Sequence, residues 1–121
     1  MRIAWAVLLS GAIPLLLNFF LPQNLFGVFE IGSVSYSGAF ILFHLVPLAF
    51  GYWAGRTWPG KHLQAYAVLG LLAGFVELVI SWGITLITPF WTVAFFDYLL
   101  ALLTAILFAA GAYFAGSTQE R

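Results

Sequence analysis

Four long apolar segments follow one another along the chain, at approximately residues 3–21, 36–55, 62–88 and 90–115. A membrane-spanning helix needs about 20 mostly apolar residues, so each segment is predicted to be one transmembrane helix. Four spans are too few to close a β-barrel, and backbone groups inside a bilayer must bond to one another. We therefore predict an all-α, polytopic membrane protein, with four transmembrane helices in an antiparallel bundle and a single domain over residues 1–121.

The small and polar residues of the third segment recur at helical spacing. They are Gly70, Gly74, Glu77, Ser81, Thr85 and Thr88. Intervals of three and four residues place them along one side of an α-helix. Small residues on such a face allow neighbouring helices to approach closely. Glu77 is therefore predicted to lie on the packing face of its helix and not in lipid.

Each of the other segments carries a similar line of small and polar positions. The first has Ser10, Gly11, Pro14 and Asn18, the second has Ser37, His44, Gly51 and Gly55, and the fourth has Asp97, Ala101, Thr104, Phe108 and Gly111. The predicted helix-packing positions are Gly51, Gly55, Gly70 and Gly74. One such line per helix predicts a bundle whose few polar groups point inward.

Composition supports a membrane location. The 121 residues are 64% hydrophobic and 7% charged, with a mean hydropathy of +1.06, whereas soluble domains carry about 25% charged residues. The lipid bilayer is therefore the expected surrounding. A net charge of zero gives no electrostatic basis for binding nucleic acid. The chain has no cysteine, which excludes disulfides and thiolate metal sites.

The basic residues predict an orientation. With four spans, Arg2, Arg56, Lys61 and Arg121 all fall on one side of the membrane, and the positive-inside rule makes that side the cytoplasm. The expected location is the cell membrane, multi-pass, with both termini cytoplasmic. The first apolar segment lacks a clear small-x-small cleavage site and is long enough to span, so we expect a retained helix and not a cleaved signal peptide.

The long connection at residues 22–35 is half apolar. Three arrangements are open for it. It could lie flat in the outer interface with Phe26, Phe29 and Ile31 in lipid, cap the bundle, or re-enter the membrane.

Polar residues from different helices are predicted to lie at similar depths. A rise of about 1.5 Å per residue puts Asn18 about 5 Å, Asp97 about 10 Å, His44 about 12 Å and Glu77 about 16 Å below the outer boundary. We expect His44, Glu77 and Asp97 to converge inside the bundle. These three residues, with Asn18 and Ser81, are the candidate proton-, ion- or substrate-binding residues.

Each of these residues also has a purely structural interpretation. An intramembrane carboxylate costs about 2.5–3.5 kcal/mol at a helix centre, so it is expected to be paired, neutral, wetted or functional. Glu77 beside His44 could exchange a proton, or could remain a protonated carboxyl that joins two helices. His44 could bond a backbone carbonyl, Asp97 could be stabilised by water and the helix dipole, and Asn18 could cap a helix.

The sequence predicts no metal, no cofactor and no catalytic residue. One histidine and two carboxylates match a non-haem iron site by residue type alone, without a supporting motif. Ligation of haem by His44 and His62 fails because the two lie about 15 Å or more apart along the membrane normal. Hydrolase, zinc-protease and phosphate-binding motifs are absent from the sequence.

Three functions remain open. The first is an oligomeric transporter or channel with a proton- or cation-handling polar cluster in the outer half of the membrane. The second is a non-catalytic membrane subunit or assembly factor of a larger complex. The third, less favoured, is a membrane-embedded enzyme acting on a lipid-like substrate. Because four helices enclose little space, we expect a homo-oligomer or association with other membrane subunits.

Overall fold

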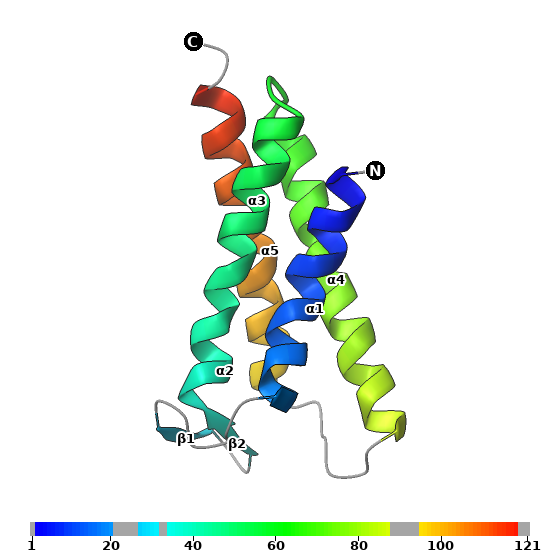
Figure 1. The fold of residues 1–121 in the computed structure, drawn as a ribbon, viewed down its shortest axis with the longest axis vertical. Coiled ribbons are helices and arrows are strands. Elements are labelled where there is room, and N and C mark those ends of the chain that lie inside the picture. The colour runs from blue at the N-terminus through cyan, green and yellow to red at the C-terminus, as the bar shows by residue number, and fades with distance from the viewer. Residues whose placement is uncertain (1, 21–26, 32–33, 88–94, 119–121) are drawn as a thin grey trace.

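The computed structural model describes residues 2–20, 27–31, 34–87 and 95–118, with side chains described for all of these except residues 2, 18–20, 31, 34–37 and 118. The elements are α1 (Arg2–Phe20), β1 (Val28–Ile31), β2 (Val34–Ser37), α2 (Gly38–Leu42), the 3₁₀ turn η1 (Phe43–Leu45), α3 (Val46–Thr57), α4 (Leu63–Ile87) and α5 (Phe95–Thr118) (Figure 1).

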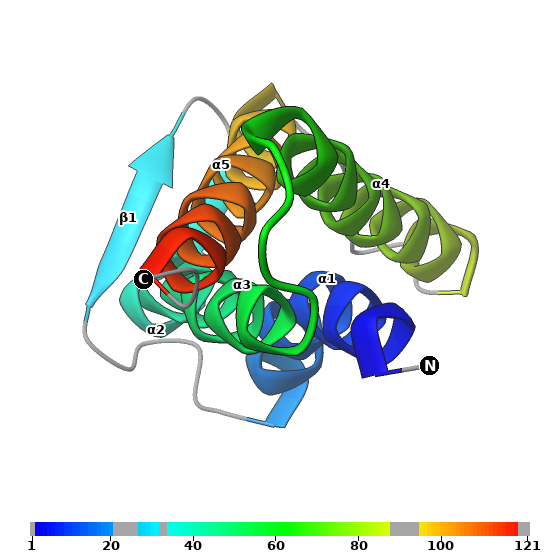
Figure 2. The same cartoon turned by 90° about the horizontal axis from the view of Figure 1, so that it is seen from above.

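The helices form a bundle of apolar rods. α2, η1 and α3 follow one another as a single rod, Gly38–Thr57, which is long and apolar enough to cross a membrane, as are Leu63–Ile87 and Phe95–Ser117. A shorter apolar stretch, Ile3–Leu17, lies within α1. The prediction of a helical bundle of apolar segments is therefore confirmed. Seen from above, neighbours follow the order α1, α3, α5, α4 around the bundle (Figure 2).

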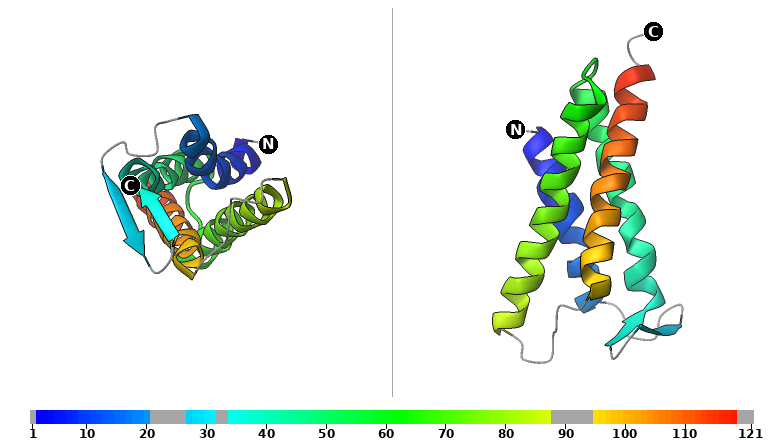
Figure 3. Two further views of the ribbon diagram at one scale, coloured as in Figure 1. Left: turned by 90° about the horizontal axis from the view of Figure 1, so that it is seen from below. Right: turned by 180° about the vertical axis from the view of Figure 1, so that it is seen from behind.

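The two ends of the bundle differ. At one end, here called the terminal end, lie the start of α1, the end of α3, the start of α4 and the end of α5. At the other end, here called the hairpin end, lie the β-strands, the end of α4 and the start of α5 (Figures 1 and 3). α3 and α5 therefore run in the same direction, and α4 runs opposite to both.

The connection at residues 22–35 and the start of the predicted second span form a β-hairpin that the sequence did not predict. Tyr36 and Ser37 therefore lie in β2 and not in a helix, which begins at Gly38. β1 pairs antiparallel with β2, from Val28 opposite Ser37 to Ile31 opposite Val34. Both strands are rich in β-branched and aromatic residues. Gly27 has a positive φ of 89°, which glycine adopts without strain. Its carbonyl accepts a hydrogen bond from the Gly38 N–H at 2.8 Å, which joins the base of the hairpin to α2.

The placement of this segment against lipid stays a prediction. Phe29 is exposed on β1. Phe26 and the side chain of Ile31 lie outside the described part of the chain.

The core has an apolar cluster in each half of the bundle. Towards the terminal end it consists of Ala6, Val7, Ala54, Ala73 and Phe108. Towards the hairpin end it consists of Leu15, Phe40 and Leu100. The buried polar residues Glu77, His44 and Thr104 lie between these clusters along the rods that carry them.

Backbones touch at the glycines. Cβ atoms added to Gly51, Gly55, Gly70 and Gly74 would meet the carbonyl oxygens of Phe108, Ala112, Ala105 and Ala101, respectively. All four contacts are made with α5, which therefore packs closely against both α3 and α4.

Candidate functional site

Glu77 lies in the core of the bundle, bonded to residues from two other rods. Its side chain is 3% exposed. Oε2 lies 2.9 Å from Nε2 of His44 in η1, and Oε1 accepts a hydrogen bond of 2.7 Å from the Thr104 hydroxyl of α5. Both carboxyl oxygens are therefore engaged. The Glu77 carboxyl joins three of the four rods.

The second ring nitrogen of His44 is also bonded. Nδ1 lies 2.8 Å from the carbonyl oxygen of Phe40, one helical turn earlier. A carbonyl oxygen can only accept, so Nδ1 carries a hydrogen and donates it. The Phe40 ring also packs edge-on against the imidazole at 4.8 Å between centroids. The tautomer and the orientation of His44 are thereby set by the chain around it.

Pro47 explains the local backbone at His44. Proline has no N–H, so it cannot give the Phe43 carbonyl an α-helical hydrogen bond. The Val46 N–H bonds to Phe43 O instead, with the three-residue spacing of a 3₁₀ turn. His44 thus lies in a tightened turn between two α-helical segments.

The geometry permits two distributions of the proton between Glu77 and His44. In the first, a carboxylate faces an imidazolium, and Nε2 donates. In the second, the carboxyl group carries the proton and donates it to a neutral imidazole. Thr104 donates to Oε1 in either case, because that oxygen accepts in both forms. One proton can therefore pass along the 2.9 Å contact without movement of a heavy atom.

Removal of this shared proton would disrupt the arrangement. A carboxylate oxygen and an unprotonated Nε2 would then face each other as two acceptors. The imidazole could relieve this conflict only by moving its hydrogen from Nδ1 to Nε2, which would break the bond to Phe40. The pair with its shared proton has no net charge in either distribution, which is the favourable condition inside an apolar core.

Asp97 is buried near the site but is not one of the two bonding partners of the Glu77 carboxyl. Its side chain, 6% exposed, lies in the first turn of α5. It precedes Thr104 by seven residues, about two helical turns, and therefore lies on the same side of α5. Of the three titratable residues that we expected to converge, His44 and Glu77 are in direct contact. Within the described residues, no three His, Cys, Asp or Glu lie close enough together to hold a metal ion.

The other expected residues lie towards the hairpin end. Ser81 is buried one turn beyond Glu77 on α4. Asn18 lies in the last turns of α1, but its side chain lies outside the described part of the chain. Thr104 was placed by its spacing on the packing face of the fourth segment, but it was not among the site residues expected from the sequence. The same helix rise puts the Thr104 hydroxyl about 20 Å deep, within about one helical turn of Glu77, and this depth is the signal that could have identified it.

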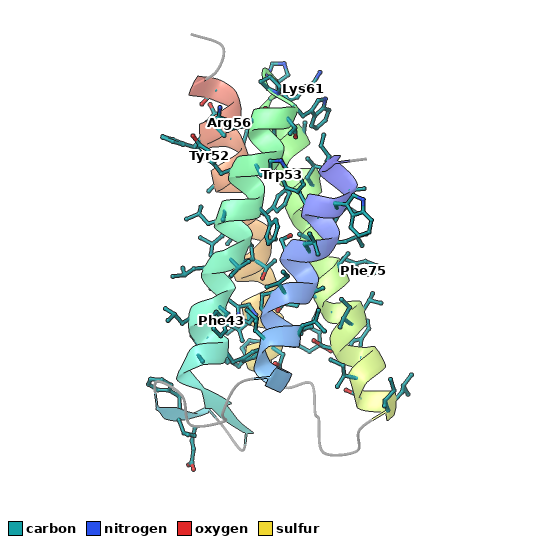
Figure 4. The ribbon with its side chains drawn as sticks, viewed as in Figure 1. Phe43, Tyr52, Trp53, Arg56, Lys61 and Phe75 are labelled. Atoms are coloured by element: carbon teal, nitrogen blue, oxygen red, sulfur yellow. The ribbon has the colours of Figure 1, made fainter. Side chains whose placement is uncertain are left out.

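Charged and aromatic side chains gather at the terminal end. Figure 4 shows Tyr52, Trp53, Arg56 and Lys61 there. The Arg56 guanidinium lies 5.9 Å from the centre of the Tyr52 ring, and the Lys61 ammonium lies 5.1 Å from the centre of the Trp58 ring. Amphipathic rings beside basic groups are typical of the boundary between a bilayer and water.

The flank of the bundle between α4 and α5 carries an apolar groove. Its lining residues are Leu71, Gly74, Phe75, Leu78, Ala101, Leu102 and Ala105. None of these residues is polar or charged, so this groove offers no group for proton chemistry. No family model, curated protein or solved structure matches the chain.

Proposed function

We propose that the protein is a small proton-handling transporter or channel, and that the Glu77–His44 pair is its proton site. The observation that supports this proposal is the contact of 2.9 Å between the two buried side chains, with Thr104 on the remaining carboxyl oxygen. This arrangement holds one transferable proton between two titratable groups.

A purely structural role would not require this chemistry. Hydroxyl and amide side chains suffice for hydrogen bonds between membrane helices, and well-packed apolar residues often replace a buried ionic pair without loss of stability. A carboxyl bonded to an imidazole adds a proton that can move between two groups of suitable chemistry. This property supports proton handling over a role as helix glue.

The proposed orientation follows from the basic residues. Arg56 and Lys61 lie at the terminal end, and by the positive-inside rule we infer that this end faces the cytoplasm of a cell membrane. The proton site then lies towards the outer half of the membrane. The core between the rods is filled by side chains such as Ala54, Ala73 and Phe108. A path for a larger substrate therefore requires a second copy or another subunit.

The hairpin end of α4 favours a second candidate function. Leu86 and Ile87 are 89% and 81% exposed, and a Cβ added to Gly83 would meet no atom within 4 Å. A helix end without close neighbours in the described chain suits a membrane subunit that packs against helices of a larger complex.

Proton flux into liposomes tests the first candidate. Purified protein is reconstituted with a pH-sensitive dye inside the vesicles, and a potassium diffusion potential drives proton entry. We expect acidification faster than in protein-free vesicles, and we expect Glu77→Gln to lower it to the protein-free rate. The amide of Glu77→Gln can still donate to His44 Nε2 and accept from Thr104, so the fold should persist.

Glu30→Gln is the matched control. Glu30 is exposed on β1, and the same chemical change there should leave the flux at the wild-type rate. Flux that survives Glu77→Gln would overturn the proposal. A wild-type protein without flux that purifies with a fixed membrane partner would instead favour the second candidate.

A further inference from the structure

The polar residues of the core are distributed unequally on the two sides of the proton site. Towards the hairpin end, Ser81 and Asp97 are both buried. Towards the terminal end, the described core is formed by Ala6, Val7, Ala54, Ala73 and Phe108. Ser10 is also buried, but its hydroxyl donates to the Val7 carbonyl of its own helix at 3.0 Å. Tyr66 is buried at the terminal end too, but its hydroxyl is bonded to the backbone of the turn between α3 and α4. Both sides have an apolar cluster, so the difference between them lies in Ser81 and Asp97.

Packing is closest on the terminal side. At Gly51 and Gly55, the α3 backbone lies so close to α5 that an added Cβ would collide with a backbone carbonyl. Gly70 of α4 lies against Ala105 of α5 in the same way. Backbones in such contact leave no room for a chain of water molecules between α5 and its neighbours α3 and α4.

Packing is looser on the hairpin side. α4 diverges from α5 towards this end (Figures 1 and 3). Thr85, Leu86 and Ile87 are exposed, and Gly83 has no neighbour within reach of an added Cβ. Ile80 and Ile84 of α4 still pack against the apolar cluster at this end, so water reaches Ser81 when a movement of α4 opens these contacts.

We propose that the proton shared by Glu77 and His44 exchanges with water at the hairpin end, by way of Asp97 and Ser81, while the terminal side is closed in this conformation. This inference rests on the proposed function, since it names the route to the same site. Asp97 and Ser81 act on this route as relay residues. Both are buried in the described structure, so the route opens by a movement of α4 at the hairpin end.

The proton balance of the route is simple. Asp97 takes a proton from a hydronium ion at the hairpin end and releases it into the core, where a carboxyl oxygen of Glu77 receives it. The proton that the pair held before leaves by the same path to water, so the number of protons on Glu77 and His44 is unchanged. Asp97 lies about 10 Å of helix before Thr104, and transient water is the carrier that we propose between Asp97 and the Glu77 carboxyl. Ser81, about 6 Å along α4 from Glu77, offers a hydroxyl that can accept and donate on that path.

The exchange of the His44 side-chain proton measures the route directly. The chain has two histidines, His44 and His62, so selective ¹⁵N labelling of histidine gives few signals. The protein in lipid nanodiscs is transferred to deuterated water, and loss of the His44 Nε2–H signal is followed by NMR. We expect Asp97→Asn to slow the exchange by about 100-fold, the lower end of what a positioned proton-transfer group contributes. Asp97→Glu should restore it.

Two further variants separate a relay from a structural effect. Ser81→Ala should slow the exchange in the same direction, and it tests the route even where Asp97→Asn does not fold. Ser10→Ala removes a buried hydroxyl outside the route and should leave the rate unchanged. The ¹⁵N shifts of His44 report whether the ring keeps its bonds to Phe40 and Glu77 in each variant. Wild-type exchange rates in both Asp97→Asn and Ser81→Ala would overturn the proposed route.

Failure of the route and failure of the proposed function give different results. Proton flux that requires Glu77 but is indifferent to Asp97 and Ser81 would overturn the route alone. Exchange at His44 that depends on Asp97, in a protein without proton flux, would support the route and overturn the transport function.

Discussion

Gly51 of α3 lies directly against the carbonyl oxygen of Phe108 in α5, with no room for a Cβ between the two backbones. Gly55 meets Ala112 in the same manner one turn further along. Because α3 and α5 run in the same direction, a step of four residues along α3 corresponds to a step of four residues along α5, from Phe108 to Ala112. The two rods are therefore joined by backbone packing at a pair of small residues four positions apart, the spacing typical of close membrane helix pairs.

Gly51→Ala should destabilise the protein. The added methyl group must separate α3 from α5, and overpacking of this kind costs about 1–3 kcal/mol. Reversible unfolding in mixed detergent micelles, followed by circular dichroism, measures the change. Gly83→Ala is the matched control, because it makes the same change in an open position of α4. There the better helix propensity of alanine should stabilise by up to about 1 kcal/mol. Equal effects of the two variants would contradict the packing argument.

Thr104→Val should weaken the association of α4 with α5, because valine has nearly the shape of threonine but lacks its hydroxyl. The variant loses the hydroxyl that donates to Glu77 Oε1. Hydrogen bonds between membrane helices contribute about 0.6 kcal/mol on average and up to about 1.7 kcal/mol, and the same unfolding measurement should show a loss in that range. Thr104→Ser keeps the hydroxyl and should retain more stability than Thr104→Val. A Thr104→Val protein as stable as wild type would show that this bond contributes nothing.

The positions of the helices along the chain could be predicted from the sequence, because apolar length and residue spacing are properties of each segment by itself. Apolar length predicted the rods, and the spacing of Gly70, Gly74 and Glu77 predicted which side of α4 faces inward. Depth along the membrane normal also placed Glu77 and His44 at similar levels. Their contact could not be derived in this way, since it depends on how each rod is rotated and on the tightened turn at His44.

The hairpin was missed for a different reason. Residues 28–31 and 34–37 alternate too briefly for a clear period, and apolar residues at these positions are equally typical of a segment in the membrane interface. The two strands pair with each other, so neither strand shows the pairing by its own sequence. The hairpin also depends on the positive φ of Gly27, which cannot be derived from the sequence alone. Thr104 was likewise visible on the packing face, but its partner was set by the rotation of α5 relative to α4.

Tyr66→Phe should loosen the turn between α3 and α4. The Tyr66 ring is buried, and its hydroxyl donates to the Trp58 carbonyl at 2.8 Å and accepts from the Lys61 N–H at 3.2 Å. Loss of the hydroxyl leaves both backbone groups without this partner, at a cost of about 1 kcal/mol. Trypsin cleavage after Lys61 measures local opening, and we expect it to accelerate about fivefold, as that free energy implies. Tyr113→Phe changes the same group at an exposed position and should leave cleavage unchanged.

Single cysteines should report which side of the membrane each end of the bundle faces. The chain has no native cysteine, so each introduced thiol is the only one present. Glu30 and His62 are exposed at the hairpin end and the terminal end, respectively. If the basic terminal end is cytoplasmic, a membrane-impermeant maleimide should label Glu30→Cys in intact cells, and His62→Cys only after permeabilisation. The reverse pattern would invert the orientation, and Asp97 and Ser81 would then relay protons from the cytoplasm. Labelling of both thiols in intact cells would contradict a single orientation, because one end must be shielded by the membrane in every molecule that spans it in the same sense.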